Sequence, residues 1–248
     1  MFSQGIVHLF LAALALSSLA VAQFSTGMTF TGDAKSAISG DFLQNTCGYN
    51  GFSSQFVSSA ESRFAYVSPD FWSHDLPCGR CANVNAGTNA SVTVMLISRH
   101  SETCAKDDCK GDLVLSPQAY RLLQSKTDLN CSIAVSWELV KCPDDFVWGG
   151  VEIAFGTETN STQLTIQPRN FQGQIAGIEV QFPDGRRFLA GGPGQDAPGS
   201  FRAVQISEGT FAPPFTIVLQ QAYSLRSVEI EVTEPPQPHQ VLTSSVAF

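Results

Sequence analysis

The cysteines of this chain are confined to one part of it, because all seven lie before residue 143. They are Cys47, Cys78, Cys81, Cys104, Cys109, Cys131 and Cys142. A chain of 248 residues is long enough for one large domain or two small ones. The uneven distribution favours two units, a cysteine-rich unit followed by a cysteine-free one. Since seven is odd, at least one cysteine stays outside the intrachain pairs.

The N-terminus has the pattern of a cleaved secretion signal. Residues 6–21 are apolar and lead into Ala20-Val21-Ala22, so we expect cleavage before Gln23. The apolar run is too short for a comfortable membrane anchor, and no other segment is suited to span a bilayer, so we expect no membrane partner. Export leads to an oxidising compartment, where cysteines are expected to form disulfides.

Charge and motif searches exclude several classes of function. The net charge is −8 and no basic run is present, which argues against nucleic acid as a partner. Cys78 and Cys81 have a metal-like spacing, but no second close pair of that kind follows, so we expect no metal. His74, His100 and His239 lack the context of a nucleophile elbow, and no phosphate-binding loop is present.

The sequence predicts short strands and the N-terminus of one helix in the cysteine-rich unit. We expect a strand at residues 28–31 followed by a Gly/Asp/Ser-rich loop, and strands around Val84 and residues 92–96 with a turn between them. Ser116 and Pro117 have the N-cap and first-position chemistry of a helix. Residues 133–140 alternate again as a strand.

The second unit contains short strands at spacings of roughly ten residues. We expect strands at residues 151–155, 163–167, 177–182, 186–189, 201–206, 215–220 and 227–232. Asp184-Gly185 is a strong hairpin signal. This spacing predicts a sandwich of two antiparallel sheets. From Glu234 a Pro-rich tail is expected to be extended or disordered.

Several short motifs, in the right order, resemble one known family. They are Met28-Thr29-Phe30-Thr31-Gly32, Thr46-Cys47-Gly48-Tyr49, Cys78-Gly79-Arg80-Cys81, Leu115-Ser116-Pro117-Gln118-Ala119-Tyr120, the strand from Val135 to Pro143, and Gln167-Pro168-Arg169-Asn170. The chain therefore resembles the expansins over most of its mature length. The resemblance implies an all-β chain, with a six-stranded double-psi β-barrel followed by an immunoglobulin-like β-sandwich.

The resemblance also implies domain boundaries and disulfides. Residues 1–22 are then the signal peptide, 23–143 the barrel, 144–233 the sandwich that binds carbohydrate, and 234–248 the Pro-rich tail. The implied pairs are Cys47–Cys78, Cys81–Cys142 and Cys104–Cys109, which leaves Cys131 over.

The groove residues of the family are only partly present. Thr29 matches, and the resemblance also places Tyr49 at the groove. The usual Asp before Leu-Ser-Pro is Val114 here, and the nearest carboxylate is Asp112. Residues i and i−2 of a strand face the same side, so we take Asp112 as the catalytic candidate that hydrogen-bonds or protonates a glycan. The alternative is a loop Asp that caps the backbone.

Two further groove positions and the sugar platform are also altered. Ser98 stands in place of a second family Asp, and His100 in place of an aromatic residue. The adjacent aromatic residues of the sugar platform are replaced by Thr162 and Gln163. Phe171 and Trp148 are possible replacements, although we expect each to be a core residue.

The resemblance implies a secreted extracellular or cell-wall protein that binds polysaccharide and loosens it without hydrolysis and without a cofactor. We expect a monomer, and a polymer of the cellulose, xylan or chitin type. One alternative is a non-catalytic binding or structural protein that kept the scaffold, and an extracellular protein ligand also stays open. The other is a weak glycoside hydrolase, for which Glu102, Asp107 and Asp108 are possible substitutes for the paired carboxylates.

Three sequons permit N-glycans. They begin at Asn89, Asn130 and Asn160.

Overall fold

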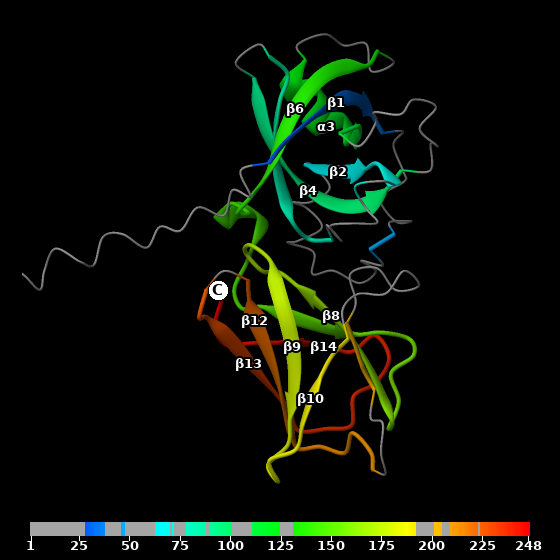
Figure 1. The fold of residues 1–248 in the computed structure, drawn as a ribbon, viewed down its shortest axis with the longest axis vertical. Helices are drawn as coiled ribbons and strands as arrows, with labels where there is room; N and C mark the ends of the chain where they lie inside the picture. Colours follow the sequence, from blue (N-terminus) through cyan, green and yellow to red (C-terminus); the bar gives the residue numbers. More distant parts are fainter. Residues whose placement is uncertain are drawn as a thin grey trace, which may run out of the picture.

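The structure is a computed structural model that describes residues 28–37, 46–47, 63–69, 71, 78–87, 90–100, 111–124, 131–191, 201–204, 209–222 and 224–248. Figure 1 shows a barrel of strands and a sandwich of strands that follow each other along the long axis. The signal peptide predicted at residues 1–22 lies outside the described residues.

The first half of the chain closes into a barrel of six strands in the order β1-β5-β2-β4-β3-β6. The strands are β1 (Thr29–Ser36), β2 (Phe64–Val67), β3 (Cys81–Asn85), β4 (Ser91–Arg99), β5 (Leu113–Leu115) and β6 (Ile133–Val140). The pairs β1–β5 and β2–β4 are parallel, and the remaining pairs are antiparallel. The prediction of a six-stranded barrel is confirmed.

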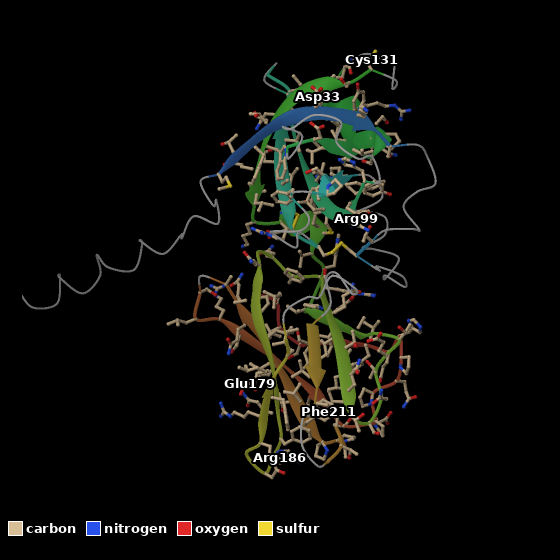
Figure 2. All side chains as sticks on the ribbon, turned by 45° about the vertical axis from the view of Figure 1, so that its right-hand side comes forward. Asp33, Arg99, Cys131, Glu179, Arg186 and Phe211 are labelled. Carbon is tan, nitrogen blue, oxygen red and sulfur yellow. A yellow bond between two sulfur atoms is a disulfide. The ribbon has the colours of Figure 1, made fainter. Side chains whose placement is uncertain are left out.

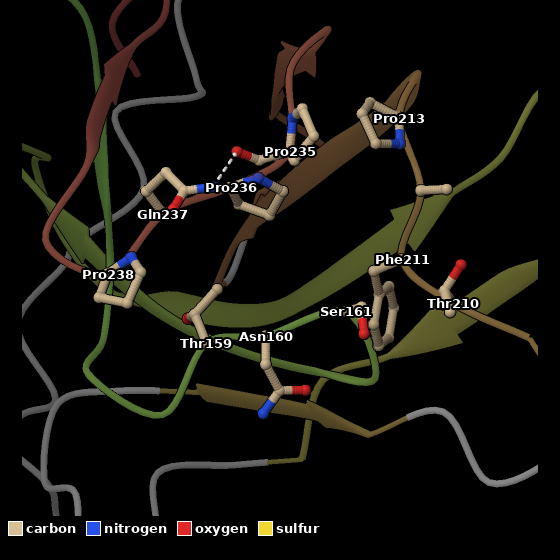
Figure 3. Close-up of a pocket in the computed structure, with 11 residues that line it drawn as sticks. Thr159, Asn160, Ser161, Thr210, Phe211, Pro213, Pro235, Pro236, Gln237 and Pro238 are labelled. Carbon is tan, nitrogen blue, oxygen red and sulfur yellow. Dashed lines mark hydrogen bonds between the residues drawn. The ribbon is translucent and has the colours of Figure 1, made fainter.

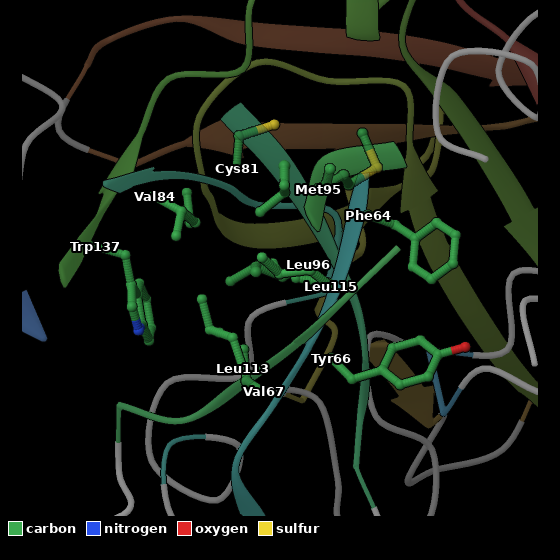
Figure 4. Close-up of a cluster of buried hydrophobic side chains, with 14 of the residues drawn as sticks. Phe64, Tyr66, Val67, Cys81, Val84, Met95, Leu96, Leu113, Leu115 and Trp137 are labelled. Atoms are coloured by element: carbon green, nitrogen blue, oxygen red, sulfur yellow. The ribbon is translucent and has the colours of Figure 1, made fainter. Parts of the chain in front are cut away.

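The barrel is filled by a cluster of buried aromatic and aliphatic side chains (Figure 4). Phe30 and Trp137 stack with their ring centroids 4.4 Å apart, and Phe71 meets both rings edge-on at 4.9 Å. The indole Nε1 of Trp137 donates a hydrogen bond of 2.8 Å to the carbonyl of Gly111. Trp137 thereby fixes the backbone that enters β5, which is the segment containing Asp112.

Strand β1 is longer than the sequence predicted. We expected a loop after Thr31, but the strand continues to Ser36. Residues Gly32 to Ala34 pair with β6, and Ala34 to Ser36 pair with β5. The two ladders satisfy the backbone groups of a segment whose small residues have low strand propensity, so tertiary pairing outweighs local preference.

Helix α3 (Pro117–Leu123) begins as predicted. The side chain of Ser116 accepts a hydrogen bond from the backbone N–H of Ala119 at 3.2 Å, and Pro117 occupies the first helical position. The helix buries Ala119, Tyr120 and Leu123 against the barrel. The 3-10 turn η2 (Asp144–Phe146) then follows β6 and precedes the sandwich.

The second half forms two four-stranded sheets, β10-β9-β12-β13 and β11-β8-β7-β14. Their strands are β7 (Glu152–Phe155), β8 (Gln163–Arg169), β9 (Ile175–Gln181), β10 (Arg187–Leu189), β11 (Phe201–Val204), β12 (Phe215–Gln221), β13 (Ser227–Val232) and β14 (Val241–Thr243). All seven predicted strands are present, and the sandwich is confirmed. The hairpin at Asp184-Gly185 is also confirmed, since Gly185 has a φ of 90° between β9 and β10.

The end of the chain forms a strand that the sequence analysis did not predict. Val241 to Thr243 pair with β7, and the backbone N–H of Ser244 donates to the carbonyl of Val151 at 2.8 Å. Phe248 packs against the sandwich core. The approach is close because Gly150 has no side chain: a Cβ there would lie 1.8 Å from the carbonyl oxygen of Ser244.

Within the described residues there are two disulfides, Cys47–Cys78 and Cys81–Cys142, and both confirm the pairing implied by the resemblance. Cys131 is exposed and belongs to neither bond (Figure 2). Cys104 and Cys109 lie outside the described residues. The amide of Gln167, in β8, donates a hydrogen bond to the backbone carbonyl of Cys47, so the first disulfide also contacts the sandwich.

None of the helices in the described ranges is long and apolar enough to cross a membrane.

Candidate functional site

Asp112 lies at one edge of the barrel, beside residues from three other strand ends. Ala34 pairs with Leu113, Val67 pairs with both Leu113 and Arg99, and His100 donates its N–H to the carbonyl of Val67. The residues next to these pairs therefore lie on adjacent strands, in the order β1, β5, β2 and β4. We call this set of residues, Asp33, Asp112, Ser68 and His100, the barrel edge.

The carboxylate of Asp112 has a structural role in this arrangement. Its Oδ1 accepts a hydrogen bond of 2.8 Å from the backbone N–H of Asp33. The bond ties the start of β5 to β1, which fits the backbone-capping alternative considered for this residue. Asp112 is nonetheless only partly buried, and Oδ2 has no hydrogen-bond partner among the described residues. One oxygen thus holds the backbone and the other is able to accept a hydrogen bond from a ligand.

Thr29 and Asp112 are not brought into contact. Thr29 is exposed at the start of β1, four positions before Asp33. At about 3.3 Å per residue, this spacing separates Thr29 from the barrel edge by about 13 Å. Thr29 and Asp33 are both exposed and share one face of β1, and Figure 2 labels Asp33. A ligand that touches both must be extended.

Thr29 also belongs to a larger polar surface on the outside of the barrel. Strand register places Thr29, Glu138, Asn83 and Thr93 side by side, and Thr31, Ser136, Asn85 and Ser91 form the next row. The core-facing partners between the rows, Phe30, Trp137, Val84 and Val92, are all buried. We call these eight outward residues the polar face. Seven of them are neutral hydrogen-bonding side chains and one is a carboxylate.

Ser98 and His100 are buried, unlike residues that contact a ligand at the surface. Ser98 is 3% exposed, and its hydroxyl accepts a hydrogen bond of 2.9 Å from the N–H of Thr46. It also shares a hydrogen bond of 2.8 Å with the Thr46 hydroxyl. His100 is buried at 8% exposure. These contacts favour a structural role for Ser98 next to the Cys47 disulfide.

Several predicted positions lie outside the described residues. They are Tyr49 of the predicted groove, Glu102, Asp107 and Asp108 of the acidic loop, and the sequon residues Asn89 and Asn130. Their roles stay predictions. In the part of the chain that the structure describes, no cluster of three or more His, Cys, Asp or Glu residues is arranged to hold a metal ion.

Trp148 is an exposed aromatic residue between the barrel and the sandwich. The prediction of a core position is confirmed for Phe171, which is 7% exposed, and is wrong for Trp148, which is 54% exposed. Trp148 is surface-exposed because it lies in the connection after η2, where neither core extends over it.

The backbone around Trp148 is held by one buried side chain. Asn170 accepts a hydrogen bond of 2.8 Å from the N–H of Trp148 through Oδ1, and its Nδ2 donates to the carbonyls of Trp148 and Gly150. Asn170 itself has a left-handed φ of 53°, which Asn tolerates better than most residues. The indole of Trp148 is thus presented on a fixed backbone. The sequence signal for this role was the Arg169-Asn170 pair, whose function sequence reasoning did not identify.

The positions of the missing aromatic platform form a polar turn. Asn160 Oδ1 accepts hydrogen bonds from the N–H and the hydroxyl of Thr162, both at 2.9 Å, and from the N–H of Gln163 at 3.0 Å. The Gln163 amide donates to the carboxylate of Glu158 at 3.0 Å. Hydrogen bonding therefore occupies the residues at which the resemblance would place a flat apolar surface.

One carboxyl group of the neighbouring sheet has an altered proton affinity. Burial raises the pKa of Glu152 above its ordinary value of 4.5, while the nearby charge of Arg169 acts in the opposite direction. The two residues are cross-strand neighbours in β7 and β8. Arg169 is buried and donates through Nε to Gln167 at 2.7 Å. Gln167 and Arg169 belong to the Gln-x-Arg-Asn motif, and the next residue is Asn170, which accepts the hydrogen bond from the N–H of Trp148.

Comparison with solved structures finds a bacterial protein with the same architecture. The chain is similar to the apo crystal structure of the expansin of Clavibacter michiganensis, with a TM-score of 0.65 and 19% identity over 89% of this chain and 98% of that one. A mutant of the same expansin, crystallised with cellohexaose, matches with a TM-score of 0.66 and 20% identity over the same shares of the two chains. No family model and no curated protein matches the sequence. The chain therefore has the expansin fold, a double-psi barrel followed by a sandwich domain.

Proposed function

We propose that this chain, whose fold is that of the expansins, is a secreted protein that binds cell-wall polysaccharide of the cellulose type and loosens it without hydrolysis. The observation that carries the proposal is the similarity to both parts of a solved expansin at once, over 98% of that chain. One of the similar structures is a complex with cellohexaose, a short cellulose chain.

Secretion is supported by chemistry within the described residues. Two disulfides cross-link the barrel unit, and such bonds persist in oxidising compartments. The apolar N-terminal segment, which has the pattern of a signal peptide, also supports secretion. We propose a barrel unit at residues 23–143 and a sandwich unit from residue 144 onward. The proposed sandwich unit includes residues 234–248 because β14 and Phe248 belong to the second core.

The proposed contact surface combines the polar face with Asp112 and Trp148. Seven of the eight side chains of the polar face are neutral hydroxyl or amide groups, which suits a neutral polymer of hydroxyl-rich sugars. Each hydrogen bond contributes only about 0.5–1.5 kcal/mol net, so an extended surface is needed for useful affinity. An exposed indole adds apolar area for the face of a pyranose ring.

Loosening then follows from competition for hydrogen bonds. A polymer chain that bonds to the polar face gives up bonds to its neighbouring chains in exchange. The exchange needs no covalent step, because the bonds broken and formed are of the same kind and similar strength. The Oδ2 atom of Asp112 is an acceptor for a sugar hydroxyl at the end of the site that lies farthest from Thr29.

Binding isotherms on cellulose, xylan and chitin, measured with substituted proteins, test the surface. We expect Trp148→Ala to weaken cellulose binding by about tenfold, the effect of losing about 1.4 kcal/mol of ring contact. We expect Asp112→Asn to weaken it less, since the amide keeps an acceptor. Leu225→Ala is the matched control, because Leu225 is a fully exposed apolar residue of the sandwich.

The three outcomes separate the alternatives. Equal loss in Leu225→Ala and Trp148→Ala would mean nonspecific adsorption. Binding to none of the three polymers would mean that the fold serves another ligand, such as an extracellular protein. Binding that depends on Trp148 supports the proposed surface.

A further inference from the structure

The chain passes from the barrel to the sandwich through a short connection. Phe146 is fully buried in the barrel cluster, and Val147 packs against that cluster. Val151 begins the sandwich cluster. Between them, Trp148 and Gly149 are exposed, and Gly149 has a left-handed φ of 69°. A connection of this kind does not by itself fix the orientation of two domains, so other contacts must do so if the orientation is constant.

Trp148 moves with the sandwich and not with the barrel. The side chain of Asn170, which directly follows β8, bonds to the N–H and the carbonyl of Trp148 and to the carbonyl of Gly150. We therefore place the pivot between Val147 and Trp148. The polar face belongs to the barrel, so the spacing between the polar face and Trp148 depends on the orientation of the two units.

Gln167 forms a hydrogen bond from the sandwich to the barrel. It lies in β8 and points away from the sandwich core, since the adjacent Ile166 is part of that core. It is nevertheless only 5% exposed. Its Nε2 donates to the backbone carbonyl of Cys47, and its Oε1 accepts a hydrogen bond of 2.7 Å from Nε of Arg169. The two ends of this buried amide thus contact different units.

The carbonyl that accepts this bond is held firmly by the barrel. Cys47 is 1% exposed and is bonded to Cys78, and its N–H donates to the carbonyl of Ile97 at 3.2 Å. The N–H of Thr46 donates to the Ser98 hydroxyl at 2.9 Å. Because the acceptor is fixed to β4, a sandwich side chain that bonds to it constrains the position of the whole sandwich.

A second hydrogen bond spans the pivot at the 3-10 turn. Gln172 donates through Nε2 to the carboxylate of Asp144 at 2.6 Å, and its own carbonyl accepts a hydrogen bond of 2.8 Å from the Gln221 amide. The turn is attached to the barrel by the ion pair between Asp145 and Arg63. Rotation about one of the two spanning bonds would displace the other, so together they resist rotation about the pivot.

We propose that Gln167 is a positioning residue, which together with Gln172 fixes the sandwich, and Trp148 with it, in one orientation to the polar face. A polymer then meets two parts of one rigid surface. Binding to the first part raises the effective concentration of the polymer at the second, and little ordering is needed on binding. The effect on binding rests on the proposed function, whereas the fixed orientation does not.

The test replaces Gln167 by glutamate. Gln167→Glu keeps an acceptor for Arg169 but loses the donor and puts an oxygen against the carbonyl of Cys47. Gln237→Glu is the matched control. Gln237 lines a hollow of about 360 Å³, and its Nε2 donates to the carbonyl of Pro235 at 3.1 Å (Figure 3). All residues that line this hollow belong to the sandwich, so the control loses the same kind of bond within one unit.

Residual dipolar couplings of the full secreted chain, measured by NMR, report the orientation of each unit. We expect the barrel and sandwich couplings to fit one common alignment tensor in the wild type and in Gln237→Glu. In Gln167→Glu each unit should keep its internal geometry but require its own tensor. Gln167→Leu, which removes the amide without adding a charge, is measured in parallel in case glutamate unfolds the sandwich. A common tensor in the folded Gln167 variants, or two tensors in the wild type, would overturn the proposal.

Cellulose binding isotherms on the same proteins test the consequence for the contact surface. We expect Gln167→Glu to weaken binding by about tenfold through the lost effective concentration, while Gln237→Glu binds like the wild type. Separate tensors together with wild-type affinity would overturn the positioning role. A wild-type protein that does not bind cellulose would refute the proposed function instead, and the couplings would still decide whether Gln167 fixes the orientation.

Discussion

Asn170 is the residue on which the presentation of Trp148 depends. Its buried amide makes three hydrogen bonds to the backbone of Trp148 and Gly150, and its own backbone is left-handed. We expect Asn170→Ala to lower the free energy of unfolding by about 2–4 kcal/mol, because it leaves buried groups unpaired and puts a Cβ-bearing residue without a local hydrogen bond at positive φ. Urea denaturation measures the loss.

Asn170→Gly is the matched control for this prediction. Glycine removes the same hydrogen bonds but adopts positive φ without strain, so it should be more stable than Asn170→Ala by about 1 kcal/mol. If both variants unfold like the wild type, Asn170 does not fix the connection.

Glu152 provides a pH-dependent prediction at the same scale. Burial raises its pKa above 4.5, so the folded protein binds the proton more tightly than the unfolded chain. The contribution to stability is fully present below pH 4.5 and is lost as the pH rises through the higher folded pKa. We expect Glu152→Gln to melt above the wild type at neutral pH, with the gap closing below pH 4.5. A wild type that is the more stable at neutral pH would mean that attraction to Arg169 outweighs burial.

Sequence patterns predicted residues whose role is set locally. Ser116 and Asp184-Gly185 act through hydrogen bonds and dihedral angles within a few residues, and both were identified correctly. The exposure of Trp148 was not predictable, because it depends on how far two separate cores extend. The hydrogen bond from the N–H of Asp33 to Asp112 depends on the register of β1 against β5, which the local sequence does not contain.

At the scale of elements, barrel closure depends on a close crossing of β1 and the segment before β5. A Cβ on Gly111 would lie 2.0 Å from the carbonyl oxygen of Thr31, so only glycine fits. We expect Gly111→Ala to destabilise the protein by at least about 3 kcal/mol, since backbone must move to accept it. Thermal melting and soluble yield report the effect.

Gly87→Ala is the control for that crossing. Gly87 has a φ of 71° but open space around its Cβ position, so its replacement carries only conformational strain of about 1–2 kcal/mol. Equal stability of the two variants would contradict the close packing of β1 on the β5 entry.

Strands were predicted correctly where apolar and polar residues alternate. They were missed or cut short where pairing with other strands decides their extent. Seven of the eight sandwich strands, β7 to β13, follow from alternation and turn residues. Strand β1 extends through Gly32 to Ser36 because β5 and β6 flank it on both sides. Strand β14 forms because Gly150 leaves room for the backbone at Ser244 and because Phe248 packs against the sandwich core. The Pro-rich composition of this segment indicates neither contact.

For the whole molecule, cross-linking is confined to one of the two cores. The disulfides span 31 and 61 residues, and each is expected to stabilise the barrel by about 4 kcal/mol through the unfolded state. The sandwich core contains no cysteine. We expect a reductant to lower the barrel transition in calorimetry while the sandwich transition stays near its original temperature. A single transition that shifts as a whole would show that the two cores unfold together.

The most direct test of the proposed activity scores mechanical weakening of cellulose paper and release of soluble reducing sugar on the same samples. The account predicts that the wild-type protein weakens the paper without sugar release, and that Trp148→Ala weakens it less while Leu225→Ala acts like the wild type. Sugar release that rises with weakening would contradict the account and identify a hydrolase. Binding without weakening would also contradict it, and would identify a binding protein that uses the expansin fold.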